Sequence, residues 1–158
     1  MRMSLLPIAL VVGLLAGCGG EPPSPVPAAP LADSQDAVTR IGDVTVRATV
    51  MPTAMLGELV AAKYDIPRAD NQIMLMVGLR RGGEGLETSV PAKIVATASD
   101  LRGKRTTIGL RELTSESLVD YLGIVPVTLP DTLKFDLDIT LDDGARTTLQ
   151  FTREFPRD

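Results

Sequence analysis

The sequence contains no histidine, no tryptophan and a single cysteine among its 158 residues. Histidine is the usual proton shuttle and a common metal ligand near neutral pH, so its absence excludes Ser-His and Cys-His catalytic pairs and histidine-based zinc sites. Three Phe and two Tyr are too few for a platform on which nucleic-acid bases stack. The net charge of −4 also argues against a nucleic-acid partner. We expect one domain of ordinary size that is not an enzyme, needs no cofactor and binds no nucleic acid.

Residues 1–17 have the pattern of a secretory signal peptide. Arg2 precedes an apolar stretch from Leu5 to Leu15. Eleven helical residues at about 1.5 Å each cover only about 17 Å, roughly half of the hydrocarbon core of a bilayer. A basic start, a short apolar core and small residues after it are typical of a cleaved signal and not of a membrane-spanning helix.

Leu15-Ala16-Gly17-Cys18 resembles a bacterial lipobox, in which the thiol receives lipid and the chain is cleaved before the cysteine. The alternative is an ordinary signal peptide followed by a free thiol, which would be a liability in an oxidising compartment. The resemblance implies a stable membrane anchor of three acyl chains on Cys18, because one chain alone holds only marginally. Gly19 in place of aspartate implies, by the same resemblance, the outer membrane. We therefore expect a lipoprotein of the cell envelope that faces the periplasm.

Residues 18–37 are predicted to form a spacer after the lipidated cysteine. Five of the twelve prolines lie between Glu21 and Pro30, a composition that favours extended polyproline II at about 3.1 Å per residue. Residues 19–37 can therefore hold the following domain up to about 60 Å from the lipid. A Pro-rich ligand for another domain is the alternative, and a spacer fits the position after an anchor better.

Residues 38–158 have the alternating pattern of β-strands. Asp43–Val50 alternates apolar with polar residues, and the alternation is clearest in the segment from Thr132 to Leu141. Further strands are predicted at Gln72–Arg80, Val90–Ala98, Arg105–Glu112, Leu118–Thr128 and Thr147–Phe155. Seven short strands separated by turns predict a mainly β fold, an antiparallel immunoglobulin-like sandwich.

The turn after Leu141 is predicted to contain three residues, Asp142 to Gly144. A two-residue loop would put the odd-numbered apolar residues of the two flanking strands on opposite faces of the sheet. A three-residue loop with Gly144 in the left-handed conformation removes this conflict and pairs Leu137 with Leu149 and Phe135 with Phe151.

One stretch breaks the β pattern and predicts a helix of two or three turns packed across one end of the sandwich. Leu56, Leu59, Val60, Lys63 and Tyr64 fall at helical spacing. Thr53 is the predicted N-cap, and Pro67 ends the helix.

The segment from Ser115 to Leu122 can be drawn either as a strand or as a helix. Pro126 and the apolar run from Ile124 to Val127 favour the strand.

The chain from about Arg40 to Asp158 resembles a family of small secreted proteobacterial proteins known as domain of unknown function family 4426. The similar points are Gly42-Asp43, the segment from Ala61 to Arg68, Asp100-Leu101-Arg102-Gly103, Tyr121, Thr132-Leu133-Lys134-Phe135, and Phe151 to Phe155. The chain departs from the family at Arg47 to Met51, where the family has a polar and aromatic cluster. The resemblance implies a sandwich in the cell envelope and supplies no activity.

Four methionines, Met51, Met55, Met74 and Met76, are weak candidates for a Cu(I) site. Thioethers are soft ligands for Cu(I), and three sulfurs could converge if Met51 and Met55 approach the strand that carries Met74 and Met76. The alternative is that these side chains fill irregular gaps under the predicted helix, and such copper sites usually include a histidine as well. We favour no metal.

Tyr64 and Arg68, at the end of the predicted helix, are the best candidates for an interaction surface. Capping of the sandwich explains these two residues equally well. Asp136 and Asp138 share one strand face and are read as a solvated surface beside Lys134. The sequence thus predicts a lipid-anchored interaction or structural module of the envelope with a protein partner. The alternative is a periplasmic protein that binds a small ligand or Cu(I).

Overall fold

The computed structural model describes residues 36–83 and 85–157. The predicted signal peptide, Cys18 and nearly all of the predicted spacer lie outside the described residues. The elements in chain order are β1 (Asp36–Ile41), β2 (Val44–Pro52), the 3-10 turn η1 (Thr53–Met55), α1 (Glu58–Lys63), β3 (Gln72–Arg81), β4 (Thr88–Ser89), β5 (Ala92–Ser99), β6 (Arg105–Ile108), β7 (Leu110–Ser115), β8 (Leu118–Pro126), β9 (Asp131–Leu141) and β10 (Arg146–Phe155). In the described part of the chain, no helix has the length and apolar character needed to cross a bilayer.

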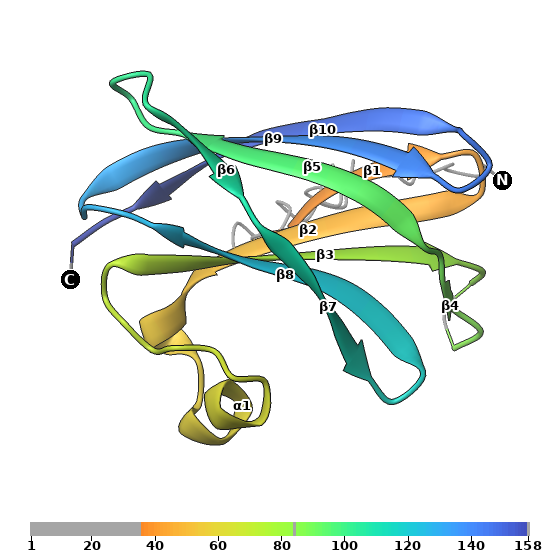
Figure 1. The fold of residues 1–158 in the computed structure, drawn as a ribbon, viewed down its shortest axis with the longest axis horizontal. Coiled ribbons are helices and arrows are strands. Elements are labelled where there is room, and N and C mark those ends of the chain that lie inside the picture. Colours follow the sequence, from red (N-terminus) through yellow and green to blue (C-terminus); the bar gives the residue numbers. More distant parts are fainter. Residues whose placement is uncertain (1–35, 84, 158) are drawn as a thin grey trace, which may run out of the picture. The chain divides into compact units, whose positions relative to one another are not determined.

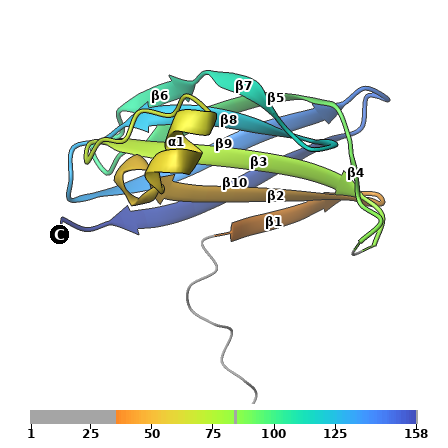
Figure 2. The ribbon, with the colours of Figure 1, turned by 90° about the horizontal axis from the view of Figure 1, so that it is seen from below.

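The strands form two antiparallel sheets that face each other (Figure 1). Sheet A has the order β1-β2-β3-β8-β7, with the short β4 paired to β3, and sheet B has the order β10-β9-β5-β6. Figure 2 shows the two layers seen from below, with α1 on the outer side of sheet A. The predicted mainly β sandwich is confirmed, with ten strands in the described residues where seven were expected.

The core between the sheets is built from the inward residues of both layers. Every second residue of β2 from Val44 to Val50 is fully buried, as is every second residue of β3 from Ile73 to Leu79. The inward residues of β9 are buried opposite them, and the rings of Phe135 and Phe151 stack with centroids 5.0 Å apart. The predicted alternation therefore identified the buried face of these strands correctly.

The predicted register of the last hairpin is confirmed. Leu137 pairs with Leu149 and Phe135 pairs with Phe151. Gly144 has φ 85°, and Leu141 exchanges backbone hydrogen bonds with Gly144 and Ala145, which leaves a three-residue loop. Ser115–Leu122 contains the end of β7 and the start of β8, so strand was the correct alternative.

Two strands differ from the sequence prediction. Arg105–Glu112 was predicted as one strand, whereas β6 pairs with β5 in sheet B and β7 pairs with β8 in sheet A, with Gly109 between them. β1 was not predicted at all, because its inward residues Ala37 and Thr39 are small or polar and give no apolar alternation. β1 begins at Asp36, two residues before the predicted start of the domain.

The helix is shorter than predicted and presents a different set of side chains to the sheet. Thr53 is not its N-cap: this fully buried residue lies in η1, and its hydroxyl exchanges hydrogen bonds with the backbone of Ala69 at 3.0 and 3.1 Å. Gly57 is extended, with φ −61° and ψ 141°, so α1 spans only the six residues Glu58–Lys63. Leu56 therefore precedes the helix. Leu56 and Ala61 are buried, whereas Leu59 and Val60, which were predicted on the apolar face of the helix, are exposed.

Four connecting segments meet at one end of the sandwich, on the left of Figure 1. They are residues 53–71, 100–104 and 127–130 and the C-terminal residues 156–157, and we call this end the loop end. The register places them together, because Pro52 pairs with Ile73, Gln72 with Pro126, and Ser99 with Lys134. The turns at residues 42–43, 116–117 and 142–144 lie at the opposite end.

Candidate interaction surface

The segment from η1 to α1 presents three large apolar side chains to solvent at the loop end. Met55 is 68% exposed, Leu59 87% and Val60 47%. The segment is held on the outer face of sheet A by a second small core, in which Leu56, Ala61 and Ile66 pack with Met74 of β3 and Leu122 of β8. The apolar tip is therefore displayed by a segment that is itself anchored by burial.

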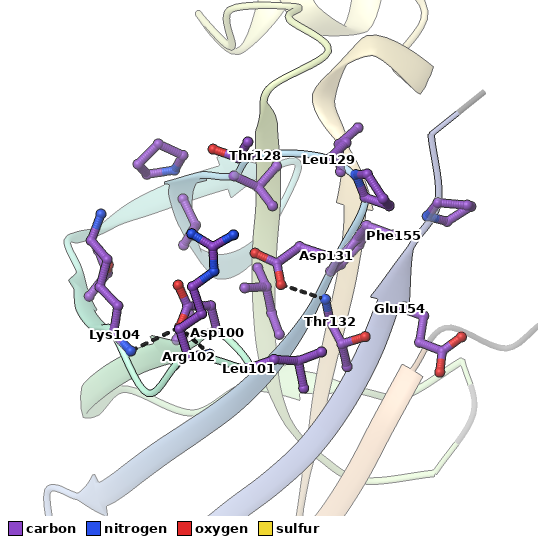
Figure 3. Close-up of a pocket in the computed structure, with 18 of the residues that line it drawn as sticks. Asp100, Leu101, Arg102, Lys104, Thr128, Leu129, Asp131, Thr132, Glu154 and Phe155 are labelled. Atoms are coloured by element: carbon purple, nitrogen blue, oxygen red, sulfur yellow. Dashed lines mark hydrogen bonds between the residues drawn. The ribbon is translucent and has the colours of Figure 1, made fainter.

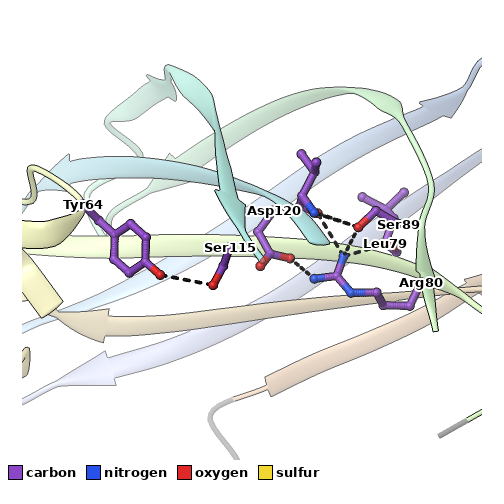
Figure 4. Close-up of polar contacts among 7 residues, drawn as sticks. Tyr64, Leu79, Arg80, Ser89, Ser115 and Asp120 are labelled. Carbon is purple, nitrogen blue, oxygen red and sulfur yellow. Dashed lines mark hydrogen bonds and ion pairs between the residues drawn. The ribbon is translucent and has the colours of Figure 1, made fainter. Parts of the chain in front are cut away.

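Tyr64 and Arg68, the predicted interaction residues, take part in contacts that hold this segment in place. The half-buried Tyr64 hydroxyl donates to Ser115 Oγ of β7 at 3.2 Å, and Arg111 donates to the Tyr64 carbonyl (Figure 4). Arg68 donates to Glu58 at 3.3 Å and to the carbonyl of Ala54 at 3.0 Å. The structure thus gives both side chains a positioning role beside the exposed tip.

The pKa of Tyr64 is held below its ordinary value. The Ser115 hydroxyl is the main cause: it accepts the hydrogen bond of the neutral phenol, and after deprotonation it can donate to the phenolate, which stabilises the charged form. The neighbouring Lys63 ammonium adds to the effect. The ammonium of Lys63 lies 4.9 Å from the centroid of the Tyr64 ring.

The four methionines do not gather into one cluster. Met51 of β2 pairs directly with Met74 of β3, and Met76 follows on the same outer face. Met74 is buried in the small core under α1, which is the gap-filling alternative. Met55 is exposed on η1. No group of three His, Cys, Asp or Glu side chains suited to a metal ion occurs within residues 36–83 and 85–157.

A hollow of about 940 Å³ opens between the sheets at the loop end (Figure 3). The β5–β6 hairpin, the β8–β9 connection and the C-terminal segment form its walls, and inward core residues such as Val125 and Phe155 form its floor. In Figure 3, Asp100 and Arg102 of the hairpin face Asp131 and Thr132 at the start of β9. The shape is that of an open mouth and not of an enclosed ligand cavity.

The rim of the hollow carries charges of both signs. Asp100 accepts the backbone N–H groups of Arg102 and Lys104 at 2.9 and 2.8 Å, which fixes the hairpin turn. None of the ion pairs between described residues involves Arg102, Lys104 or Arg157. The side chains of Arg102 and Lys104 are thus available to a partner, whereas the Arg157 guanidinium donates to the Leu129 carbonyl at 2.6 Å.

Leu101 projects from the tip of the same hairpin and is 79% exposed. Sequence reasoning treated this residue only as part of a turn motif. The sequence does contain a signal for this exposed residue: Leu101 is a large apolar residue between Asp100 and Arg102, in a turn that does not require one. Tyr64 and Arg68, the predicted interaction residues, therefore lie in the segment that displays Met55, Leu59 and Val60, whereas the prediction did not include these apolar side chains or Leu101.

The carboxylates Asp136 and Asp138 on sheet B have partners on their own face. Lys134 lies 3.2 Å from Asp136, and Thr148 donates to Asp138 at 3.1 Å. Asp138 is exposed, as the predicted solvated face requires, whereas the Asp136 side chain is only 19% exposed and its Oδ2 is buried without a hydrogen-bond partner among the described residues.

Residues 38–158 match the family described as a domain of unknown function (DUF4426). The chain belongs to this family. A crystal structure of a DUF4426 family protein from Pseudomonas aeruginosa PAO1 is similar to this chain, with 25% sequence identity and a TM-score of 0.66 over 78% of this chain and 97% of that one. No curated protein sequence matches the chain.

FetP of uropathogenic Escherichia coli strain F11 has a related fold. A structure of FetP produced in the periplasm of E. coli is 11% identical, with a TM-score of 0.51 over 77% of this chain and 95% of that chain. A copper-bound variant of FetP is 10% identical, with a TM-score of 0.49 over 77% of this chain and 93% of that chain. At this level of identity, the likeness concerns the fold alone.

Proposed function

We propose that this protein is a lipid-anchored domain of the cell envelope that acts by contact with another envelope component and not by catalysis. The single observation that supports this function best is the collection of exposed apolar side chains at the loop end. Met55, Leu59, Val60 and Leu101 are four of the seven most exposed large apolar residues among those described. Single exposed apolar residues are ordinary, and we take the presence of four of the seven on two segments of one end as the mark of a contact surface.

The location follows from the N-terminal pattern. A short apolar signal followed by Leu15-Ala16-Gly17-Cys18 supports export and attachment of lipid to Cys18, with the domain in the periplasm and the anchor in the outer membrane. Metabolic labelling with a palmitate analogue tests the anchor. Labelling is expected in the unaltered chain and absent after Cys18→Ser.

Site-specific crosslinking in cells tests the contact surface. A photoreactive amino acid placed at position 59 or 101 is expected to give reproducible crosslinked adducts. The same amino acid at position 86, in place of Leu86, is the matched control and is expected to give none. Leu86 is 82% exposed but lies between β3 and β4 at the end away from the loop end. Equal adducts from all three positions, or none from 59 and 101, would overturn the proposed surface.

Binding of Cu(I) is the second candidate function, because Met51 lies directly opposite Met74 in the register. Side chains at such positions have Cβ atoms about 4.5–5.5 Å apart, so two thioethers can reach one soft ion, and Met76 is the nearest third sulfur on that face. Titration of the protein with Cu(I) against a competing chelator tests this function. Unchanged binding by the Met51→Leu and Met74→Leu variants, or binding weaker than micromolar, would reject it.

A further inference from the structure

The exposed apolar residues of the loop end stand on two separate protrusions. Leu59 and Val60 belong to α1, which lies on the outer side of sheet A (Figure 2). Leu101 belongs to the β5–β6 hairpin of sheet B and lines the hollow at the loop end. A protein interface usually concentrates its apolar contacts in a central packed patch. Separated aliphatic tips with charged neighbours instead fit the boundary between lipid headgroups and acyl chains, where the tip is buried and the neighbours remain in water.

The charges around these tips are balanced. Residues 53–71 and 100–104 contain four acidic residues and four basic ones: Glu58, Asp65, Asp70 and Asp100 against Lys63, Arg68, Arg102 and Lys104. Proteins that recognise anionic lipid do so with an excess of Lys and Arg. Equal numbers of acidic and basic residues in these two segments therefore fit a surface of zwitterionic headgroups, which repels neither positive nor negative side chains.

The start of β1 shows at which side the described chain enters the domain. Asp36 pairs with Thr49, four residues before η1, and β1 then runs away from the loop end to Ile41. The chain thus enters the domain from the side of the loop end. Residues 19–35 reach at most about 50 Å when extended, so the proposed anchor keeps the whole domain near the bilayer at a high effective concentration. Weak apolar contacts are sufficient for docking under these conditions.

We infer that the loop end docks on the lipid surface to which the protein is anchored, inserting Leu59 and Leu101 at the headgroup boundary. This inference rests on the proposed lipid anchor at Cys18, and it names the bilayer itself as the envelope component that the contact surface meets. In the docked domain, the strands extend from the loop end away from the membrane, and the hollow faces the headgroups.

Fluorescence quenching in reconstituted vesicles tests the inference with the full lipidated chain. Because Cys18 is the only cysteine and its thiol carries the lipid, a second cysteine can be labelled uniquely in Leu59→Cys, Leu101→Cys or Leu86→Cys. In vesicles of phosphatidylethanolamine and phosphatidylcholine with a spin-labelled lipid, probes at 59 and 101 are expected to be quenched severalfold more than the probe at 86. Addition of anionic lipid is expected to leave this difference unchanged.

The outcomes separate the inference from the proposed function. Failure of the protein to float with the vesicles would reject the anchor at Cys18. Flotation with equally weak quenching at 59, 101 and 86 would reject docking while leaving the anchor intact. Shielding of 59 and 101 that requires an added envelope extract would assign the surface to a protein partner and overturn the lipid inference.

Discussion

Arg80 and Asp120 form an ion pair on the outer face of sheet A (Figure 4), and both side chains lie directly above Gly78. Gly78 pairs with Asp120 across β3 and β8, and Arg80 lies two residues further along β3. The guanidinium also donates to the Val119 carbonyl at 2.9 Å and to Ser89 Oγ, while Ser89 Oγ accepts the Val119 N–H at 2.7 Å. Arg80 therefore connects β3, β4 and β8 at one point.

Arg80→Ala is expected to destabilise the domain by about 2 kcal/mol, because it leaves the Asp120 carboxylate, only 17% exposed, without its charged donor. Arg81→Ala is the matched control. Its ion pair with Asp43 has side chains 48% and 69% exposed, and loss of such a pair costs less than about 1 kcal/mol. Urea denaturation followed by circular dichroism measures both, and equal losses would refute the structural role of Arg80.

Gly78→Ala is expected to cost about 1–3 kcal/mol, because the added methyl group would lie 2.8 Å from Asp120 Oδ1 and force the ion pair to move. At Gly83, an added Cβ meets no atom within 4 Å, so Gly83→Ala serves as the control in the same denaturation experiment. A Gly78→Ala protein as stable as the parent would show that the pair can shift freely.

The pKa of Asp36 is held below its ordinary value of 3.8, mainly by the hydrogen bond from Thr49 and then by Arg47. A carboxyl group whose pKa is lower in the folded state adds stability above its unfolded pKa, and this stability is lost as the pH falls through the folded value. Asp36→Asn is therefore expected to lower the free energy of unfolding by about 1 kcal/mol at pH 7. The difference between the two proteins should vanish at a pH well below 3.8. A difference that persists unchanged at that acidity would contradict the assignment.

Met74→Ala is expected to cost about 2–4 kcal/mol, because Met74 is 4% exposed and fills the small core beneath α1. Met74→Leu should cost less than about 1.5 kcal/mol, since it conserves volume. This variant removes the sulfur without unfolding the site, so it also suits the Cu(I) titration. Met55→Ala, at an exposed position, should stay within about 0.5 kcal/mol of the parent in thermal denaturation.

Arg68→Ala is expected to loosen the segment from η1 to α1 without affecting the sheets. The guanidinium joins Ala54 to Glu58, so its removal should speed amide hydrogen exchange at Ala61 and Ile66. Amides in β9 are the internal control. Faster exchange in β9 as well would mean that Arg68 supports the whole fold and not this segment.

The features that the sequence predicts well are those set by local chemistry. The odd-numbered apolar residues of β9 and β10 permit only a loop of odd length, and Gly144 provides the left-handed position for the turn. The change of sheet at Gly109 was not predictable in this way. Ile108 and Leu110 both point inward, so the alternation continues through a residue at which the pairing partner changes from β5 to β8.

The candidate surface was predicted only in part, for a similar reason. Helical spacing marks Leu59 and Val60 as buried, but the extended Gly57 delays the start of α1 and turns these two residues to solvent. Tyr64 and Arg68 were recognised by residue type, whereas their contacts with Ser115 and Ala54 depend on tertiary packing. The hollow has no sequence signal, because it is formed by three segments that are far apart in the chain.

The position of β1 determines how the domain would bear mechanical tension from the anchor proposed at Cys18. β1 is an edge strand with six residue pairs to β2, and no other strand of residues 36–83 and 85–157 pairs with it. A pull on the chain before Asp36, directed past the loop end, acts along β1 and not across it. The hydrogen bonds to β2 are then strained together in shear instead of opening one after another. The proposed anchor would therefore load β1 in the direction in which a β-ladder resists best.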